Sequence, residues 1–305
     1  MNKKKFLVTG GAGFIGSHTV SALIERGDEV AIVDNLITGK RENIHPRASF
    51  YEMNITDPRL EEVFEKEKPD YIYHFAFNVM VPESVENPLI DMDSISGSVN
   101  LFNNVRKYGI KKVVFSSSGF VYGNTDKLPT KEDTPIQPIS SYVVSKQAVE
   151  NYLDFFYRAY RLPYVVLRYG TVYGPGQVRG AMSDYIRKLV AGEQAVIWGD
   201  GLKSRDYVYI DDITNANLLA MDTEEKPSNM MFNVGSGKET TLNEVYQLIA
   251  DLLGKYAQPV YLPDRSGELM RNCLDSNKFQ SVSNWTPQYL FKDGLKLRLK
   301  AEGLI

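Results

Sequence analysis

The stretch LVTGGAGFIGS, residues 7–17, decides the fold that this chain can adopt. An apolar run ends in a glycine-rich turn and continues into a segment with helical spacing, which predicts a strand, a tight turn and a helix. In such a unit Gly10 allows the turn, Gly13 lets a pyrophosphate approach the backbone, and Gly16 lets the helix pack closely on the strand. Phosphates would then lie at the helix N-terminus, where N–H groups and the helix dipole favour anions.

Asp34 distinguishes a dinucleotide site from an ordinary glycine-rich turn. It ends the next apolar run, residues 30–33, and lies about 20 residues beyond the turn, where a carboxylate can bind the ribose 2′-hydroxyl. The turn alone is a weak signal, because many glycine-rich turns bind nothing, but the full context favours a dinucleotide. Asp34 would repel a 2′-phosphate, so NAD is expected rather than NADP.

Composition limits the possible functions. The chain has 305 residues, of which 43% are hydrophobic and 24% charged, and its net charge of −3 gives no support for nucleic-acid or membrane binding. No apolar run can span a bilayer and the N-terminus lacks a signal-peptide pattern, so a cytoplasmic location is expected. The single Cys273 excludes an internal disulfide. His18, His45 and His74 lack metal-ligand spacing and are interpreted as structural, so no metal site is expected.

Apolar β-type runs alternate with helical segments over the first 170 residues, which predicts an α/β fold with a Rossmann-type, doubly wound parallel sheet. The strands are expected at 5–9, 29–34, 49–55, 70–76, 112–117 and 163–169, and the helices near 14–26, 58–67, 88–108 and 141–161. Later elements are expected near 179–192, 196–198, 206–210 and 241–254. We expect an NAD-binding Rossmann domain at 1–170. Residues 171–305 should form mainly a smaller substrate-binding lobe, with some chain returning to the sheet.

Two pairs of residues at the ends of expected strands are candidates for binding the cofactor. Asn54 and Ile55 could meet the adenine, and Phe75 and Ala76 could line the nicotinamide side. Loop and core packing would explain either pair equally well. Their position favours ligand binding, because open α/β sheets bind ligands at the carboxyl ends of their strands.

A serine-rich strand end and a tyrosine–lysine pair are the candidates for chemistry. The fifth expected strand leads into SSSGFVYG (116–123), and Tyr142 and Lys146 follow in YVVSK (142–146). The i, i+4 spacing puts this pair on one helix face, where the ammonium can lower the pKa of the Tyr142 phenol and make it a proton acceptor. Ser118 can share the substrate proton. Such pairs are common on helices without function, but the dinucleotide turn and the serines favour catalysis.

These motifs resemble the extended short-chain dehydrogenase/reductase superfamily and, within it, the NAD-dependent nucleotide-sugar epimerase/dehydratase family. The likeness covers nearly the whole chain. The matching motifs are TGGAGFIGS (9–17), DN (34–35), HFA (74–76), SSSGFVYG (116–123), YVVSK (142–146), LRYGTVYGPG (167–176), WGDGLKSRDYVYIDDI (198–213) and RSGE (265–268). The resemblance implies that Ser118, Tyr142 and Lys146 are catalytic, with Tyr142 as the base. The implied cofactor-binding residues are Gly10, Gly13, Phe14, Ile15, Gly16, Asp34, Asn35, Thr38, Gly39, Asn54, Ile55, Phe75, Ala76, Tyr142, Lys146 and Tyr169.

The two positions after Ser118 bear on the type of reaction. Dehydratases of the family carry an acidic pair there, because eliminating water needs an acid and a base beyond the tyrosine, and decarboxylating relatives tend to carry Glu at the second position. This chain has Gly119 and Phe120. It is therefore most similar to the UDP-glucose 4-epimerases. That similarity implies oxidation at C4 by Tyr142 and NAD, turning of a 4-keto sugar in the site, and return of the hydride to the opposite face, with NAD staying bound throughout.

The resemblance further implies a nucleotide-sugar substrate, expected to be a UDP-hexose. Arg205 and Arg265 match pyrophosphate-binding arginines, whose planar forks suit phosphate oxygens, although surface arginines are more often merely solvated. Glu268 matches the acid that holds the nucleotide ribose. Trp198 could lie beside the base or could pack between the lobes.

Several positions depart from the family pattern. Thr171 replaces the usual asparagine of the LRYFN motif, Asn54 replaces a frequent adenine-binding aspartate, and Ser94 replaces a frequent asparagine near the cofactor. The pocket-size position falls at Asn272, a mid-sized residue that leaves N-acetylated sugars possible. Ser118, Tyr142, Thr171 and Asn272 complete the expected substrate-binding set.

Other functions stay open. The chain could be a UDP-N-acetylhexosamine or UDP-glucuronate 4-epimerase, a 2-epimerase of a nucleotide-linked deoxysugar, or another member of the epimerase/dehydratase family. A non-catalytic NAD-binding sensor belongs to a different class, and the presence of Ser118, Tyr142 and Lys146 together argues against it.

A homodimer is expected through segments 88–108 and 141–161. The reasons are the resemblance and the apolar residues Val149, Leu153 and Phe156, which recur at helical spacing. The alternative is that this stripe covers the sheet.

Overall fold

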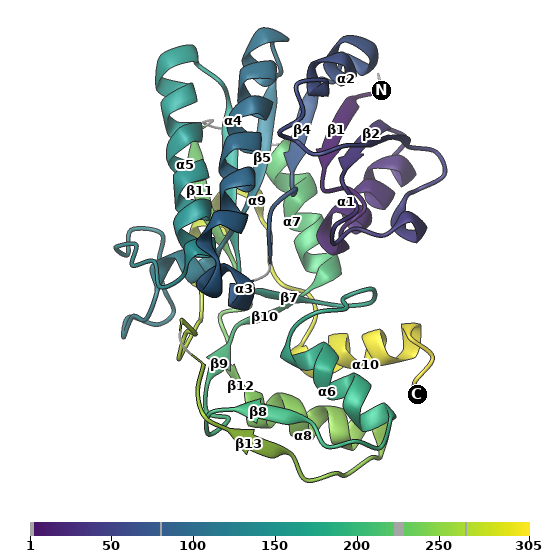
Figure 1. Ribbon diagram of the computed structural model, residues 1–305, viewed down its shortest axis with the longest axis vertical. Helices are drawn as coiled ribbons and strands as arrows, with labels where there is room; N and C mark the ends of the chain where they lie inside the picture. The colour runs from purple at the N-terminus through teal and green to yellow at the C-terminus, as the bar shows by residue number, and fades with distance from the viewer. Residues whose placement is uncertain (1–2, 80, 223–228, 266) are drawn as a thin grey trace.

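The computed structural model describes residues 3–79, 81–222, 229–265 and 267–305, arranged as two lobes (Figure 1). The larger lobe is built on a seven-stranded sheet with the order β11-β6-β5-β4-β1-β2-β3, in which all neighbours are parallel. Its strands are β1 (Lys5–Thr9), β2 (Glu29–Asp34), β3 (Ser49–Glu52), β4 (Tyr71–His74), β5 (Lys112–Ser118), β6 (Tyr164–Tyr169) and β11 (Met230–Val234). The predicted Rossmann-type parallel sheet is confirmed.

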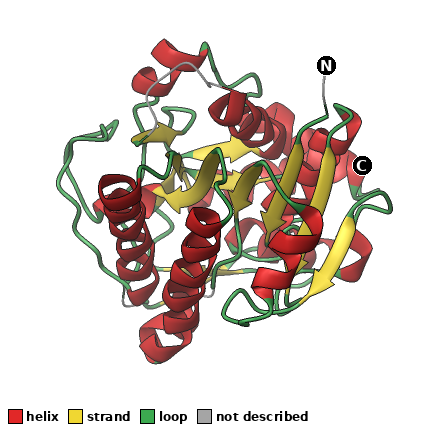
Figure 2. Cartoon of the chain, turned by 90° about the horizontal axis from the view of Figure 1, so that it is seen from above, coloured by secondary structure: helices red, strands yellow, loops and turns green. Residues whose placement is uncertain are grey.

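Helices cover both faces of this sheet (Figure 2), which explains why its central strands are buried on both faces and carry continuous apolar runs rather than an alternating pattern. On one face α1 (Phe14–Glu25) packs beside α7 (Ile210–Asp222). On the other face α2 (Leu60–Glu67), α4 (Met92–Lys107) and α5 (Ser141–Tyr160) lie side by side. Each layer forms its own buried apolar cluster against the sheet.

Two strands end earlier than the sequence predicted. β3 stops at Glu52 and β4 at His74, so the two candidate pairs after them belong to loops at the carboxyl edge of the sheet. The last strand of the sheet, β11, comes from the second half of the chain and pairs with β6 along Met230–Val234. The polypeptide therefore crosses between the lobes more than once.

The apolar stripe on α5 covers the sheet, which is the alternative to a dimer interface that the sequence left open. Val149, Leu153 and Phe156 are all buried and pack in the cluster between α5 and the sheet. They are core residues because helical spacing alone does not reveal which neighbour an apolar face meets. A different set on α5, formed by Val144, Tyr152 and Phe155, is exposed.

The smaller lobe combines three helices with short two-stranded ribbons around a third apolar cluster. Its helices are α6 (Ala181–Val190), α8 (Leu242–Leu253) and α10 (Phe291–Ala301). Its ribbons pair β7 (Thr171–Tyr173) with β10 (Tyr207–Tyr209), β8 (Val196–Trp198) with β13 (Val260–Leu262), and β9 (Ser204–Arg205) with β12 (Thr240–Thr241). Shorter helical segments are η1 (Arg41–Asn43), α3 (Val81–Glu86), η2 (Pro88–Asp91), η3 (Gly119–Tyr122) and α9 (Asn277–Ser283).

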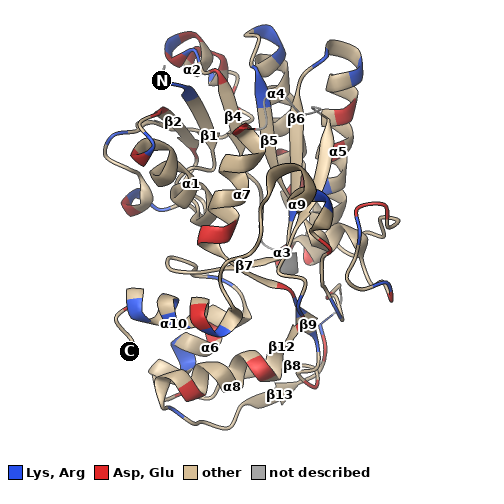
Figure 3. Ribbon diagram, turned by 180° about the vertical axis from the view of Figure 1, so that it is seen from behind, with Lys and Arg blue, Asp and Glu red and all other residues tan. Residues whose placement is uncertain are grey.

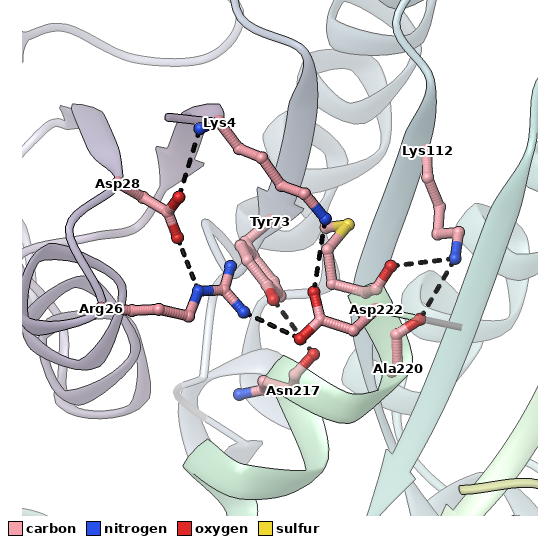
Figure 4. Close-up of polar contacts among 9 residues, drawn as sticks. Lys4, Arg26, Asp28, Tyr73, Lys112, Asn217, Ala220 and Asp222 are labelled. Atoms are coloured by element: carbon pink, nitrogen blue, oxygen red, sulfur yellow. Dashed lines mark hydrogen bonds and ion pairs between the residues drawn. The ribbon is translucent and has the colours of Figure 1, made fainter. Parts of the chain in front are cut away.

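Polar contacts fix the C-terminal end of α7 to the amino ends of the strands (Figure 4). Asp222 pairs with Lys4 at 3.6 Å and with Arg26 at 2.8 Å. The buried Lys112 ammonium donates to the Met221 carbonyl oxygen at 3.0 Å, where a cation also opposes the negative end of the helix dipole. These contacts lie at the edge opposite the carboxyl ends of the strands and are interpreted as structural.

Basic and acidic residues both occur along the ribbon of each lobe (Figure 3). Among the described residues, no helix combines the length and the apolar character needed to cross a membrane.

Candidate functional site

A cavity of about 670 Å³ opens at the carboxyl ends of the sheet strands, within the ~300–1,000 Å³ range typical of small-molecule sites. It is lined by fifteen of the sixteen residues predicted to bind the cofactor, and Gly39 is the exception. Ser118 also lines it. A smaller hollow of about 430 Å³ lies at the opposite edge among residues of mixed charge, including Lys5, Asp28 and Glu29, and contains no comparable set.

The glycine-rich turn forms one wall of this cavity. Gly10 has φ +73°, and a Cβ there would lie 2.5 Å from the Ala76 backbone nitrogen. A Cβ on Gly16 would overlap the carbonyl oxygen of Gly10, so the first turn of α1 can approach β1 only without a side chain. Gly13 is the N-cap of α1 and no side chain of the described residues caps this helix. Its first N–H groups therefore provide the anion-binding end that a diphosphate requires.

Asp34 is buried at the carboxyl end of β2 and is held by two backbone donors. The Ala12 N–H donates to Oδ2 at 3.0 Å, and the Leu36 N–H donates to Oδ1 at 2.9 Å. Gly39 does not line the cavity, but a Cβ there would lie 2.7 Å from Asp34 Oδ1, so its missing side chain makes room for the carboxylate. The glycine-rich turn and the N-terminus of α1 form a cradle that can accept the diphosphate of NAD. The Asp34 carboxylate can accept hydrogen bonds from the ribose hydroxyls of NAD.

The loops after β3 and β4 close the ends of the cavity. Asn54 accepts a hydrogen bond from the Thr56 N–H at 3.1 Å, and Ile55 fills the space beside Gly97, where a Cβ would lie 2.5 Å from Ile55 Cγ1. Phe75 stacks on Tyr73 with 5.7 Å between the ring centroids. These residues line the cavity and pack against their neighbours at the same time.

Ser118, Tyr142 and Lys146 meet beside the cavity. Ser118 ends β5, and its hydroxyl lies near enough to the Tyr142 phenol to lower the pKa of that phenol. Lys146, one turn further along α5, donates to the Ser116 carbonyl oxygen at 2.6 Å. Its ammonium lies 3.7 Å from the centroid of the Phe77 ring and 5.8 Å from that of Tyr142. The three predicted side chains therefore form one cluster facing the cavity.

The electrostatics of this cluster differ from the sequence-based prediction. Burial raises the pKa of the Tyr142 phenol to about 12, despite the opposing effect of Ser118. Burial also lowers the pKa of the Lys146 ammonium to about 7. The expected lowering of the Tyr142 pKa by Lys146 is thus wrong for this arrangement, because desolvation dominates and the ammonium is directed to Ser116 and Phe77.

Some lining residues were missed from the sequence. Phe77 directly follows the HFA motif, and Ser116 belongs to the serine-rich strand end, so an adjacent sequence motif could have pointed to each of them. No such motif contains or adjoins Arg179. It lies in a loop between β7 and α6, lines the cavity from the smaller lobe, and makes no ion pair with the described residues.

The remaining predicted substrate residues lie outside this cavity. The Arg265 guanidinium stacks on the Trp198 ring at 3.7 Å from its centroid. Glu268 accepts a hydrogen bond from the buried Lys203 ammonium at 2.6 Å. The smaller lobe thus brings Trp198, Arg265 and Glu268 onto one ribbon and the adjoining loop.

Arg205 and Asn272 approach the catalytic strand end instead. Arg205 lies 5.5 Å from the centroid of the Phe120 ring, and Asn272 Nδ2 donates to the Gly119 carbonyl oxygen at 3.4 Å. Asn272 Oδ1 and Thr171 Oγ1 are buried polar atoms without a hydrogen-bond partner among the described residues. Such atoms are costly unless a ligand satisfies them.

Comparison with known proteins places the chain among nucleotide-sugar enzymes. The sequence profile of the NAD dependent epimerase/dehydratase family matches residues 6–235. A curated relative from Methanocaldococcus jannaschii, named a putative UDP-glucose 4-epimerase, is 41% identical over 296 residues, which cover 95% of each chain.

Two solved structures are similar over almost their full length. A UDP-glucose 4-epimerase from Thermotoga maritima, solved with UDP-glucose, is 42% identical with a TM-score of 0.94 over 98% of each chain. A UDP-glucose 4-epimerase from Thermus thermophilus, solved with NAD, is 36% identical with a TM-score of 0.93, covering 99% of this chain and 100% of that one.

Proposed function

The chain belongs to the NAD dependent epimerase/dehydratase family, and from that premise we propose that it is an NAD-dependent UDP-glucose 4-epimerase, an isomerase that interconverts UDP-glucose and UDP-galactose. The observation that carries the proposal is the cluster of Ser118, Tyr142 and Lys146 facing a cavity that fits NAD.

The residues after Ser118 support epimerisation over dehydration. A Cβ on Gly119 would lie 2.8 Å from both terminal methyl carbons of Leu274, so Leu274 would have to shift before a carboxylate could occupy this position. Phe120 packs in a small apolar cluster with Leu274 and lies against Arg205. Elimination of water lacks its additional acid and base at these positions, whereas removal and return of one proton requires only Tyr142.

Bound NAD would accept a hydride from C4 of the sugar and later return it. Because burial raises the pKa of the Tyr142 phenol, Tyr142 must first lose its own proton to solvent, which the positive charges of Lys146 and of the bound nicotinamide ring would favour. We propose that the resulting phenolate takes the proton of the 4-hydroxyl and gives it back after the 4-keto sugar has turned. The Ser118 hydroxyl, already beside that phenol, would hold the same substrate oxygen. Lys146 would contribute positive charge beside the phenol.

We assign the nucleotide to the smaller lobe. Arg205 and Arg265 would bind the diphosphate, Glu268 the ribose, and Trp198 the base. Two of the four buried side-chain atoms without partners among the described residues, Thr171 Oγ1 and Asn272 Oδ1, belong to this proposed substrate set, and we propose that sugar hydroxyls satisfy them. In this proposal residues 1–170 bind NAD and 171–305 bind mainly the substrate.

We further propose a homodimer formed by the exposed face of α5 together with α4. Val144, Tyr152 and Phe155 are 50%, 39% and 49% exposed, an unusual apolar density for a solvated helix face. Sedimentation at micromolar concentration tests this, and a monomer would reject it.

A cytoplasmic location is also proposed, in keeping with the free, buried Cys273.

The decisive experiment has two parts. Purified protein should release NAD on denaturation, and it should convert UDP-glucose to UDP-galactose with NAD neither added nor consumed. The same incubation with UDP-N-acetylglucosamine, UDP-glucuronate and a nucleotide-linked deoxysugar tests the alternative substrates. Release of NADP, or product from none of these sugars, would reject the proposal.

A further inference from the structure

A buried ion pair lies directly beneath the catalytic cluster. Glu150 follows Lys146 by one turn on α5, and Arg168 projects from β6. Arg168 donates two hydrogen bonds to the carboxylate, from Nε to Oε1 at 3.0 Å and from Nη2 to Oε2 at 2.6 Å. The Arg168 and Glu150 side chains are only 2% and 3% exposed. A bidentate pair of this kind fixes the position of its carboxylate.

The same carboxylate also holds the end of β5. The Ser117 hydroxyl donates to Glu150 Oε1 at 2.6 Å. Ser117 lies between Ser116, whose carbonyl oxygen accepts the hydrogen bond from Lys146, and Ser118, which lies beside Tyr142. Glu150 is therefore attached to segment 116–118, which contacts Lys146 through Ser116 and lies beside Tyr142 through Ser118.

Several charged or titratable groups surround Lys146. Tyr142 and Glu150 share its helix, His74 faces it from β4, and Arg168 lies beyond Glu150 on β6. Burial, with a smaller effect from Lys146, lowers the His74 pKa to about 3, so this ring is neutral. Burial lowers the pKa of Lys146, and the Glu150 carboxylate raises it. The anion that favours the charged ammonium is thus the one held by Arg168 and Ser117.

We propose that Glu150 is a positioning residue of the catalytic centre: held by Arg168, it fixes the Ser116–Ser118 strand end and keeps Lys146 protonated beside Tyr142. A purely structural ion pair does not account for this arrangement well. Buried ion pairs contribute little net stability compared with an apolar pair of similar volume. The bond to Ser117 and the one-turn spacing from Lys146 give Glu150 a role that no apolar replacement could fill.

The inference rests on the proposed epimerase activity, so its test includes a readout that needs no turnover. In Glu150→Gln the pH midpoint for reductive methylation of Lys146, followed by peptide mass spectrometry, should move acidward by about one pH unit. The alkaline limb of the kcat profile with UDP-glucose should move in the same direction, because Lys146 loses its proton at lower pH. Glu150→Asp retains the anion and should restore both midpoints.

Tyr122→Phe is the matched control. The Arg168 guanidinium also donates to the Tyr122 hydroxyl at 2.9 Å, so this variant weakens the same network on its side away from Lys146. A structural role predicts a loss of stability in both variants, larger in Glu150→Gln because it breaks the buried ion pair, and no movement of either midpoint. The proposed role predicts movement in Glu150→Gln and none in Tyr122→Phe.

The double variant Glu150→Gln, Arg168→Gln covers the case in which the single variant does not fold, because it does not leave the buried Arg168 guanidinium without its carboxylate. The same acidward movement is expected, and unchanged midpoints in a folded variant would overturn the inference. If the wild-type protein fails to epimerise any nucleotide sugar, the proposed function fails, but the methylation midpoints still test the role of Glu150.

Discussion

Tyr142→Phe separates catalysis from folding in this protein. The change removes one oxygen from a half-buried side chain, and the edge-to-face contact with Phe77, at 6.0 Å between centroids, can persist. A positioned general base commonly contributes 10²–10⁴-fold to rate, on the order of 3–5 kcal/mol of barrier. The lost polar contact with Ser118 should cost about 1 kcal/mol of stability. Turnover should therefore fall by at least two orders of magnitude, while Tm falls by only about 2 °C.

The assay compares kcat for UDP-glucose with Tm and bound NAD in the same preparation. Tyr152→Phe is the matched control, since it removes a phenolic oxygen from an exposed position of the same helix. It should leave kcat and NAD content unchanged. Near wild-type kcat in Tyr142→Phe would refute the assignment of this phenol as the base. A loss of Tm that accounted for the lost activity would refute it equally.

Four further predictions address other parts of the site. Gly16→Ala should lose bound NAD and several degrees of Tm, because its Cβ would overlap the Gly10 carbonyl; retention of NAD at wild-type stoichiometry would contradict the proposed cradle. Arg179→Gln should weaken rebinding of NAD to stripped protein severalfold, measured by fluorescence titration, and more so at low salt. Lys146→Met should abolish turnover yet raise the Tm of NAD-free protein. Burial lowers the Lys146 pKa from 10.5 to about 7, so keeping this lysine in the folded protein costs stability at any pH where the unfolded chain is protonated; the gain in Tm should be largest below pH 7 and shrink as the pH approaches 10.5. Phe155→Glu should shift sedimentation from dimer toward monomer without changing the NAD content.

The sequence predicted the large lobe well because its signals are local. A central parallel strand is buried on both faces, so a run such as residues 113–115 is apolar at every position and easy to recognise. The glycine-rich turn and Asp34 were recognisable because their spacing is set by one strand–turn–helix unit. The predicted ends of the short strands were wrong. β3 and β4 stop at Glu52 and His74, where the chain leaves the sheet without a change in apolar character.

What the sequence could not supply are contacts between distant segments. The stripe of Val149, Leu153 and Phe156 has the spacing of any amphipathic helix, and only the sheet beneath it decides that this face is buried. Arg179 sits in an aperiodic loop, and its place in the cavity depends on how the smaller lobe docks. The pKa of Lys146 likewise depends on burial and on neighbours from other elements, which no i, i+4 pattern reveals.

The short helix η3 connects the two halves of the proposed reaction. It begins directly after Ser118, and its backbone and side chains contact residues that we assign to the substrate: Asn272 bonds to the Gly119 carbonyl and Arg205 lies against Phe120. Gly119 also packs against Leu274, whose methyl carbons would lie 2.8 Å from a Cβ at this position. In the proposed reaction, placement of a nucleotide sugar by the smaller lobe would therefore be coupled to the strand end that carries Ser118. Because the same strand end is held from below by Glu150, the position of the serine relative to Tyr142 is set from both lobes at once.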